Sequence, residues 1–297
     1  PLPAQQFVSD HERIVLDTSF GDIASRLEDG LAIPAFEAAG PRAKLRFEPG
    51  KARAGIVTCG GLCPGLNDVI RAITFSLWFN YGMRDILGFR YGFEGMVASS
   101  GYEPMPLNPE VVDDINQHGG TILGSSRGPQ NVKEMVDYLV ELKIDMLFPI
   151  GGDGTQRGAL ALVNEIARRG LSIAVVGVPK TIDNDIALVE RTFGFETAVA
   201  MAREPIRAAH VEAKSCSYGI SLVKLMGRES GFVATYAALS NSEVDVVLIP
   251  EVPFRMDGDG GLLTFLENRL RRRRHAVVVV AEGAGQDLAV QYGEGGF

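Results

Sequence analysis

The chain has 297 residues, and its 29 Lys and Arg residues against 37 Asp and Glu residues give a formal net charge of −8 at pH 7. This acidic balance argues against a nucleic-acid-binding protein, because such proteins carry a basic surface. Hydrophobic residues make up 46% and charged residues 22%, which indicates a folded globular protein of one or two domains without a membrane span of about 20 apolar residues.

Residues 1–50 have scattered apolar positions and end in a stretch rich in proline and glycine, so we predict an N-terminal extension and linker there. From Ala54 onward, apolar runs alternate with segments of helical periodicity. We predict strands at 54–58, 144–150 and 173–178, and helices that include residues 66–77 and 159–166. Continuous apolar strands separated by helices favour a parallel sheet covered on both faces. In such sheets, ligands bind at the carboxyl ends of the strands.

The second half of the chain continues this α/β pattern. We predict a helix at 195–213 and strands at 218–225, 244–249 and 275–281. Pro205 lies inside the predicted helix, where a proline costs roughly 3 kcal/mol. We therefore expect either a kink at this point or two shorter helices.

Glycine-rich segments follow the first two strands. Residues 60–65, Gly-Gly-Leu-Cys-Pro-Gly, lie before a helix, where glycines let backbone N–H groups face an anion. The segment is neither a P-loop nor a dinucleotide pattern, and a tight turn without a ligand also explains it. Residues 151–155, Gly-Gly-Asp-Gly-Thr, suit a nucleotide whose phosphates lie against the backbone, with Asp153 facing Mg²⁺ through water. The alternative is a helix capped by Asp153 or Thr155, but a cap does not need three glycines.

Two carboxylates follow the third strand, in residues 179–185, Pro-Lys-Thr-Ile-Asp-Asn-Asp. In an extended loop, Asp183 and Asp185 point to the same side, so that one can accept a proton while the other helps to bind a metal. A solvated turn also uses such residues, but it does not explain why polar residues follow three successive strands. Cys59 and Cys63 lack the second Cys or His pair of a zinc site, so we interpret them as small loop residues.

These motifs, in this order, resemble those of the phosphofructokinase family. The resemblance runs from about Lys51 to Asp287. It includes residues 60–65 with Asn67 and Arg71, and residues 119–127, 151–155, 180–185, 226–228 and 281–283. Among subgroups, the chain is most similar to ATP-dependent enzymes of plants and trypanosomatids, which share Lys180 with the pyrophosphate-dependent branch.

The resemblance implies an α/β fold of two Rossmann-like three-layer domains with mostly parallel sheets and an active site in the cleft between them. After the extension at 1–50, the expected domains are a nucleotide-binding domain at 51–193 and a sugar-phosphate-binding domain at 194–297. The second domain is expected to be incomplete at its C-terminal end, because chains of the family continue past Phe297. Gly219 also departs from bacterial members, which carry an arginine there that reaches the neighbouring subunit's sugar phosphate.

The implied activity is phosphorylation of D-fructose 6-phosphate at its C1 hydroxyl by ATP, with Mg²⁺ as cofactor. Asp183 corresponds to the general base, and Asp153 and Asp185 correspond to the acids associated with the metal. The catalytic set is Asp183, Thr181, Arg228 and Lys180. The nucleotide set is Gly60, Gly61, Arg127, Gly152, Asp153, Gly154 and Thr155. The substrate set is Thr181, Asp183, Asp185, Met226, Gly227, Arg228 and Glu282.

The phosphoryl donor and the activity itself have alternatives. In the family, a glycine at the position of Gly154 leaves room for ATP. A lysine at the position of Lys180 is found in the pyrophosphate-dependent enzymes, so pyrophosphate stays the alternative donor. A NAD-kinase or lipid-kinase relative shares residues 151–155 but lacks 180–185. An inactive or regulatory nucleotide-binding subunit would be expected to have lost Asp183 or Asp153, and both are present.

The expected partners are ATP and fructose 6-phosphate, without nucleic acid or membrane. The resemblance implies a homo-oligomer, with a tetramer favoured. Residues 271–274, four consecutive arginines, are interpreted as a solvated helix end, with an anionic allosteric effector site as the alternative. With three cysteines and no visible signal sequence, we expect the cytoplasm, or a glycosome or plastid if the source is a trypanosomatid or a plant.

Overall fold

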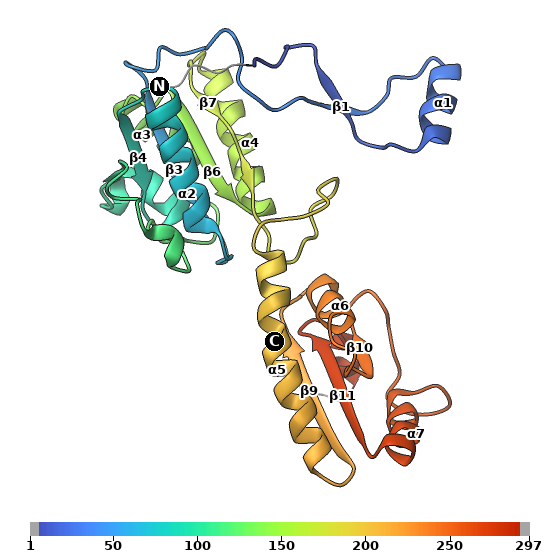
Figure 1. The fold of residues 1–297 in the computed structure, drawn as a ribbon. Coiled ribbons are helices and arrows are strands. Elements are labelled where there is room, and N and C mark those ends of the chain that lie inside the picture. Colours follow the sequence, from blue (N-terminus) through green and yellow to red (C-terminus); the bar gives the residue numbers. More distant parts are fainter. Residues whose placement is uncertain (1–5, 292–297) are drawn as a thin grey trace. The chain divides into compact units, whose positions relative to one another are not determined.

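The computed structural model describes residues 6–291, so the last residues of the predicted second domain lie outside the described part. The chain divides into two compact units (Figure 1). Unit 1 contains Pro1–Gly61 and Leu66–Val178, and unit 2 contains Leu62–Gly65 and Pro179–Phe297. Each unit is an α/β assembly around its own largely parallel sheet, as predicted.

The sheet of unit 1 is built on β3 (Arg53–Thr58), whose residues from Ala54 onward are buried. Its parallel neighbours are β4 (Asp85–Phe89) and β6 (Met146–Gly151), and β7 (Ala174–Val175) pairs in parallel with β6. A short strand, β5 (Met105–Pro106), closes the β4 edge in antiparallel, and β8 (Val178–Pro179) also pairs with β6. The predicted strand at 173–178 is thus two short strands.

Helices cover both faces of this sheet. α3 (Val132–Glu141) and α4 (Asp153–Arg168) pack on the face that carries Val57, Phe89 and Leu147. α2 (Leu66–Phe75) continues as a π-helical turn, η1 (Ser76–Asn80), and covers the face that carries Phe148 (Figure 1). Short 3₁₀ turns form η2 (Gly92–Met96), η3 (Ala98–Ser100) and η4 (Ile115–Gln117).

The predicted N-terminal extension forms a small arm. β1 (Arg13–Val15) pairs in antiparallel with β2 (Ala35–Glu37), and α1 (Phe20–Glu28) lies between them in sequence. No residue of α1 is buried, although its apolar residues follow helical spacing.

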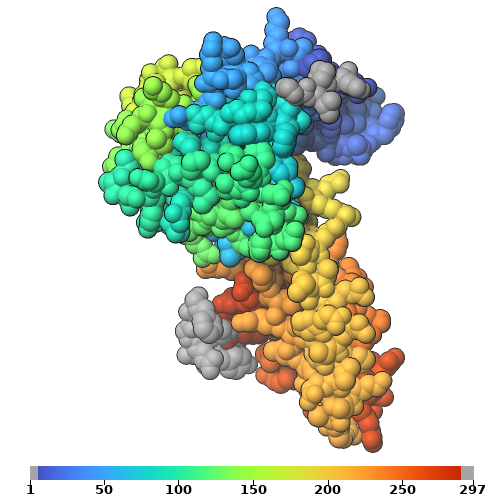
Figure 2. Space-filling view, turned by 60° about the vertical axis from the view of Figure 1, so that its left-hand side comes forward, coloured from blue at the N-terminus to red at the C-terminus, as the bar shows by residue number. Residues whose placement is uncertain are grey.

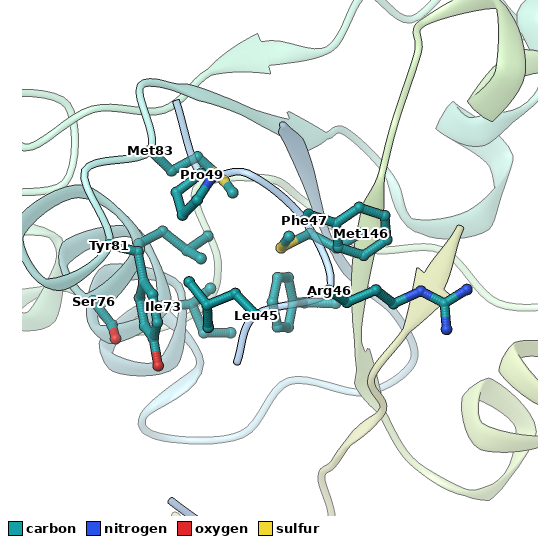
Figure 3. A pocket seen from close by; sticks show the side chains of 11 residues that line it. Leu45, Arg46, Phe47, Pro49, Ile73, Ser76, Tyr81, Met83 and Met146 are labelled. Atoms are coloured by element: carbon teal, nitrogen blue, oxygen red, sulfur yellow. The ribbon is translucent and has the colours of Figure 1, made fainter. Parts of the chain in front are cut away.

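A cavity of about 340 Å³ opens in unit 1 next to the linker that follows this arm (Figure 3). Residues 45–47 and Pro49 line it from the linker, and the other lining residues come from α2, from η1 and the residues that follow it, and from β6. Because α2 runs back from the carboxyl end of β3, and Met146 begins β6, the cavity lies toward the amino ends of the strands. It is therefore away from the glycine-rich motifs, which follow the carboxyl ends.

Unit 2 has three parallel strands in the order β10 (Val246–Leu248), β11 (His275–Ala281) and β9 (Gly219–Leu225). α5 (Phe195–Ser215) and α6 (Phe232–Leu239) pack on one face, and α7 (Leu262–Arg273) packs on the other face over β10 and β11. On the α7 side of β9, Ile220 and Leu222 are 50% and 66% exposed. α8 (Gln286–Gln291) follows β11.

Pro205 does not divide α5, which is one helix of 21 residues, so the structure excludes the second of our two alternatives, two shorter helices. Proline cannot donate to the carbonyl four residues earlier, that of Met201. Both residues are on the exposed side of α5, whose outer surface is drawn in gold (Figure 2). Water can therefore replace the missing hydrogen bond, which explains why the helix continues. No helix among residues 6–291 is both long and apolar enough to cross a membrane.

Candidate active site

Unit 1 brings the first glycine-rich loop against residues 124–127. The Oγ of Ser125 donates to the carbonyl of Gly60 at 2.6 Å, and the N–H of Gly60 donates to the carbonyl of Ser126 at 3.0 Å. Gly60 has a φ of +83°, a conformation that glycine adopts without strain. A Cβ on Gly61 would lie 3.4 Å from Nη2 of Arg127, so this guanidinium lies against the loop. The predicted positions Gly60, Gly61 and Arg127 are thus neighbours.

The second glycine-rich segment forms the start of α4, after β6. Gly152 is the N-cap residue and no side chain caps the helix, so the alternative of a cap by Asp153 or Thr155 is wrong. Asp153 and Gly154 are exposed in the first turn. The side chain of Thr155 is turned inward and packs on Gly151, where a Cβ would meet it at 2.2 Å. The first N–H groups of a helix have no partner within it, so this end can accept an anion.

Unit 2 brings the predicted base and its neighbours together in the loop after β8. Asp183 is half-buried, and its Oδ1 is buried without a hydrogen-bond partner. Burial raises the pKa of Asp183, and the negative charges of Asp185 and Glu282 raise it further, while the buried Lys180 opposes this. A raised pKa brings a carboxylate closer to the range in which it can exchange a proton near neutral pH.

The loop of Asp183 is a turn and not the extended segment that we predicted. Asn184 has a φ of +57°, and its Oδ1 accepts a hydrogen bond from the N–H of Thr192 at 2.7 Å. Thr181 donates through Oγ1 to Oδ1 of Asp185 at 2.9 Å. In this turn Asp185 is exposed, whereas Asp183 is half-buried and its Oδ1 is shielded from solvent.

The predicted sugar-phosphate residues lie on two adjoining loops of unit 2. The N–H of Gly283 donates to the carbonyl of Gly227 at 3.0 Å, and a Cβ on Gly283 would lie 1.7 Å from the carbonyl oxygen of Arg228. The loops that carry Met226, Arg228 and Glu282 are therefore in contact. These three side chains are exposed, as residues that meet a ligand should be.

Two residues with structural roles in this site were not singled out from the sequence. Asn184 fixes the turn between the two aspartates, and Ser230 donates through Oγ to the carbonyl of Asp183 at 3.1 Å. The position of Asn184 between two acids was a visible signal, but nothing in the sequence pointed to Ser230.

Cys63 is a protonated structural thiol in this geometry. Burial raises the pKa of Cys63 to about 11, so its thiol is protonated at neutral pH and donates to the carbonyl of Phe193 at 3.1 Å. No group of three or more His, Cys, Asp or Glu side chains within residues 6–291 could hold a metal by itself.

Comparison with known proteins gives the family. The model of the phosphofructokinase family matches residues 53–294. An ATP-dependent 6-phosphofructokinase of Amycolatopsis methanolica is 51% identical over 287 residues, which are 97% of this chain and 62% of the relative. ATP-dependent 6-phosphofructokinase 7 of Arabidopsis thaliana is 53% identical over 85% of this chain and 52% of the relative. The chain therefore spans between half and two thirds of the length of these relatives.

Solved structures agree with this fold. Phosphofructokinase from Saccharomyces cerevisiae superposes with a TM-score of 0.67 at 27% identity, over 79% of this chain and 34% of the other. A pyrophosphate-dependent phosphofructokinase from Marinobacter aquaeolei gives a TM-score of 0.70 at 22% identity, over 81% and 64% of the two chains, which supports the fold alone. With its motifs at the predicted strand ends and this match over most of its length, the chain belongs to the phosphofructokinase family.

Proposed function

We propose that the full-length protein transfers the γ-phosphoryl group of ATP to the C1 hydroxyl of fructose 6-phosphate, giving fructose 1,6-bisphosphate and ADP. The observation that carries the proposal is the state of Asp183, whose Oδ1 is buried and has no hydrogen-bond partner. A buried carboxylate oxygen without a partner costs free energy, so a proton-bearing substrate group is expected to meet it. Names of relatives that are about half identical to this chain support the same reaction.

In the proposed reaction, the oxygen of the sugar's C1 hydroxyl attacks the γ-phosphorus of ATP, and ADP leaves. Asp183 accepts the proton of that hydroxyl. The raised pKa of Asp183 suits a base, because a carboxylate with an ordinary pKa takes protons poorly at neutral pH. Thr181 holds the loop through its bond to Asp185, and Lys180 supplies a positive charge next to the base. Arg127 and Arg228 are exposed cations for the charge on the transferring group.

The acids fit a magnesium ion that arrives with the nucleotide. Mg²⁺ keeps several waters and uses one or two carboxylates together with substrate phosphates, so a cluster of three acids is not needed. Asp153 and Asp185 are each exposed carboxylates of the kind that such an ion uses. When bound, it would neutralise charge on the phosphate oxygens.

ATP is the proposed donor because of the space at Gly154. A Cβ built there meets nothing within 4 Å, so the start of α4 has room for a nucleotide. Pyrophosphate stays the alternative donor because of Lys180, which is buried beside Asp183. We assign nucleotide binding to residues 51–193 and sugar-phosphate binding to 194–297, in a homo-oligomeric cytoplasmic enzyme.

The test is to assay the full-length protein with fructose 6-phosphate and each donor, beside its Asp183→Asn variant. Formation of fructose 1,6-bisphosphate from ATP, lost in the variant, is the expected result. Comparable activity with pyrophosphate would overturn the donor. Nucleotide binding without turnover would favour the alternative of a regulatory subunit.

A further inference from the structure

Both main-chain polar groups of Asp183 are held by side-chain hydroxyls rather than by a helix or a sheet. Its N–H donates to Oγ1 of Thr181 at 3.1 Å, and its carbonyl accepts from Oγ of Ser230 at 3.1 Å. Thr181 belongs to the same loop and moves with it. Ser230 lies 47 residues further along the chain, so its bond fixes the loop against another element.

Ser230 is itself held in place. The residue is only 4% exposed, and its Oγ also accepts from the N–H of Phe232, the first residue of α6, at 3.4 Å. Between these two residues, the N–H of Gly231 donates to Oε1 of Glu251 at 2.7 Å. The hydroxyl of Ser230 therefore joins the start of α6 to the carbonyl of Asp183.

The same serine ends the loop that carries the proposed sugar-phosphate residues. Gly227 has a φ of +129°, and a Cβ there would lie 2.2 Å from the carbonyl oxygen of Ser230, so the loop folds tightly back on itself. Gly227 also accepts the hydrogen bond from Gly283, next to Glu282. Met226, Arg228 and the carbonyl of Asp183 are thus connected through one compact loop.

We propose that Ser230 is a positioning residue, which fixes the backbone of Asp183 to the sugar-phosphate loop so that the base and the bound sugar keep one geometry. The proposal rests on the proposed function. Ser230 acts through Asp183 and its own hydroxyl is committed to two backbone groups, so it need not contact the substrate.

Removing the hydroxyl should affect turnover more than binding. In Ser230→Ala, the carbonyl of Asp183 loses its donor and the loop can shift. Misplacement of a reacting group by about 1 Å can cost on the order of 100-fold in rate. We expect kcat to fall about 10-fold to 100-fold, with KM for both substrates within about twofold of the parent.

The experiment compares the full-length parent with Ser230→Ala, Ser230→Thr and a matched control, Ser240→Ala. Ser240 lies at the other end of α6 and donates through Oγ to the carbonyl of Ala237 at 2.9 Å, a bond of the same kind away from the loop. Two quantities are measured: kcat and KM with fructose 6-phosphate and ATP, and amide hydrogen exchange of peptides that cover residues 180–185. Thr retains the hydroxyl and should restore both quantities.

Faster exchange at 180–185 together with a selective loss of kcat in Ser230→Ala, absent in Ser240→Ala, is the expected result. Unchanged exchange, unchanged kcat, or equal losses in Ser230→Thr and Ser230→Ala would each overturn the positioning role. If Ser230→Ala does not fold, Ser230→Cys takes its place, because it keeps the shape of the side chain and weakens its hydrogen-bond donor. Ser230→Cys must then show both faster exchange at 180–185 and a selective loss of kcat. If the parent itself lacks activity, the proposed function fails, and the exchange measurement still decides whether Ser230 holds the loop.

Discussion

Replacing Gly154 by aspartate should stabilise unit 1 while weakening its use of ATP. Gly154 is the second residue of α4, is exposed, and has no atom within 4 Å of a Cβ placed on it. The new side chain therefore meets no obstacle. Glycine is less favourable than aspartate in a helix, and a carboxylate near the positive end of the helix contributes about 0.3–1 kcal/mol. We expect the free energy of unfolding to rise by roughly 1 kcal/mol.

The same substitution should lower kcat/KM for ATP, although it raises stability. A unit charge about 5 Å from a phosphate, at an effective dielectric constant of about 20, is repelled by about 3 kcal/mol. Since each 1.4 kcal/mol is a factor of ten, kcat/KM for ATP should fall on the order of 100-fold. In the proposed binding mode, pyrophosphate lacks the part of ATP that lies at Gly154, so its use should be little affected.

The assay is full-length enzyme with each donor, beside the uncharged variant Gly154→Asn, and urea unfolding of all three proteins. Asparagine has the bulk of aspartate without its charge, so it separates steric exclusion from repulsion. A Gly154→Asp enzyme whose kcat/KM for ATP stays within about threefold of the parent would refute the reasoning. Loss of stability in the same variant would contradict the open space described around Gly154.

Three further predictions concern the base, the core and the response to acid. Asp183→Asn should lower kcat at least 10²–10⁴-fold with little change in ATP affinity, which steady-state kinetics and nucleotide titration can separate. Leu147→Ala removes a fully buried side chain of β6 and should cost about 2–5 kcal/mol in urea unfolding, and a cost below about 1 kcal/mol would contradict the packing described for unit 1. Hydrogen bonds from Arg168 and Arg169 lower the pKa of Glu165 from 4.5 to about 2. Its contribution to stability is therefore complete above pH 4.5 and lost as the pH falls toward 2, so Glu165→Gln should flatten the loss of stability with acid over this interval, as followed by unfolding at each pH.

The order of strands and helices could be predicted because each buried strand is a continuous apolar run that ends at glycine or polar residues. The strands at 54–58 and 275–281 were predicted to within a residue, since both are buried along most of their length. The strand at 173–178 was harder to place, because only residues 174–175 and 178–179 pair with β6 and their neighbours are partly exposed.

In the candidate site, too, some residues can be predicted from the sequence and others cannot. Residue types and motif order single out Asp153 and Asp183 as candidates, because the motifs are local in sequence. Sequence could not give the difference between Asp183 and Asp185, which arises from the left-handed turn at Asn184 and from burial. It could not give Ser230 either, since a serine is an ordinary residue before a helix and its bond to Asp183 spans 47 positions. The continuity of α5 likewise depends on which side of the helix Pro205 faces, as its exposure shows.

The incomplete cover on β9 bears on how the chain behaves in concentrated solution. β9 is at the edge of its sheet within the described residues, so one row of its backbone N–H and C=O groups has no strand beside it. Ile220 and Leu222 add an apolar strip on the same strand, and such an edge can recruit a strand from another molecule. Lys224 follows on the same face and is exposed, so the apolar strip ends at a positive charge. A charged side chain on an edge strand opposes pairing with another molecule, and salt screens that charge, so solubility should fall as ionic strength rises.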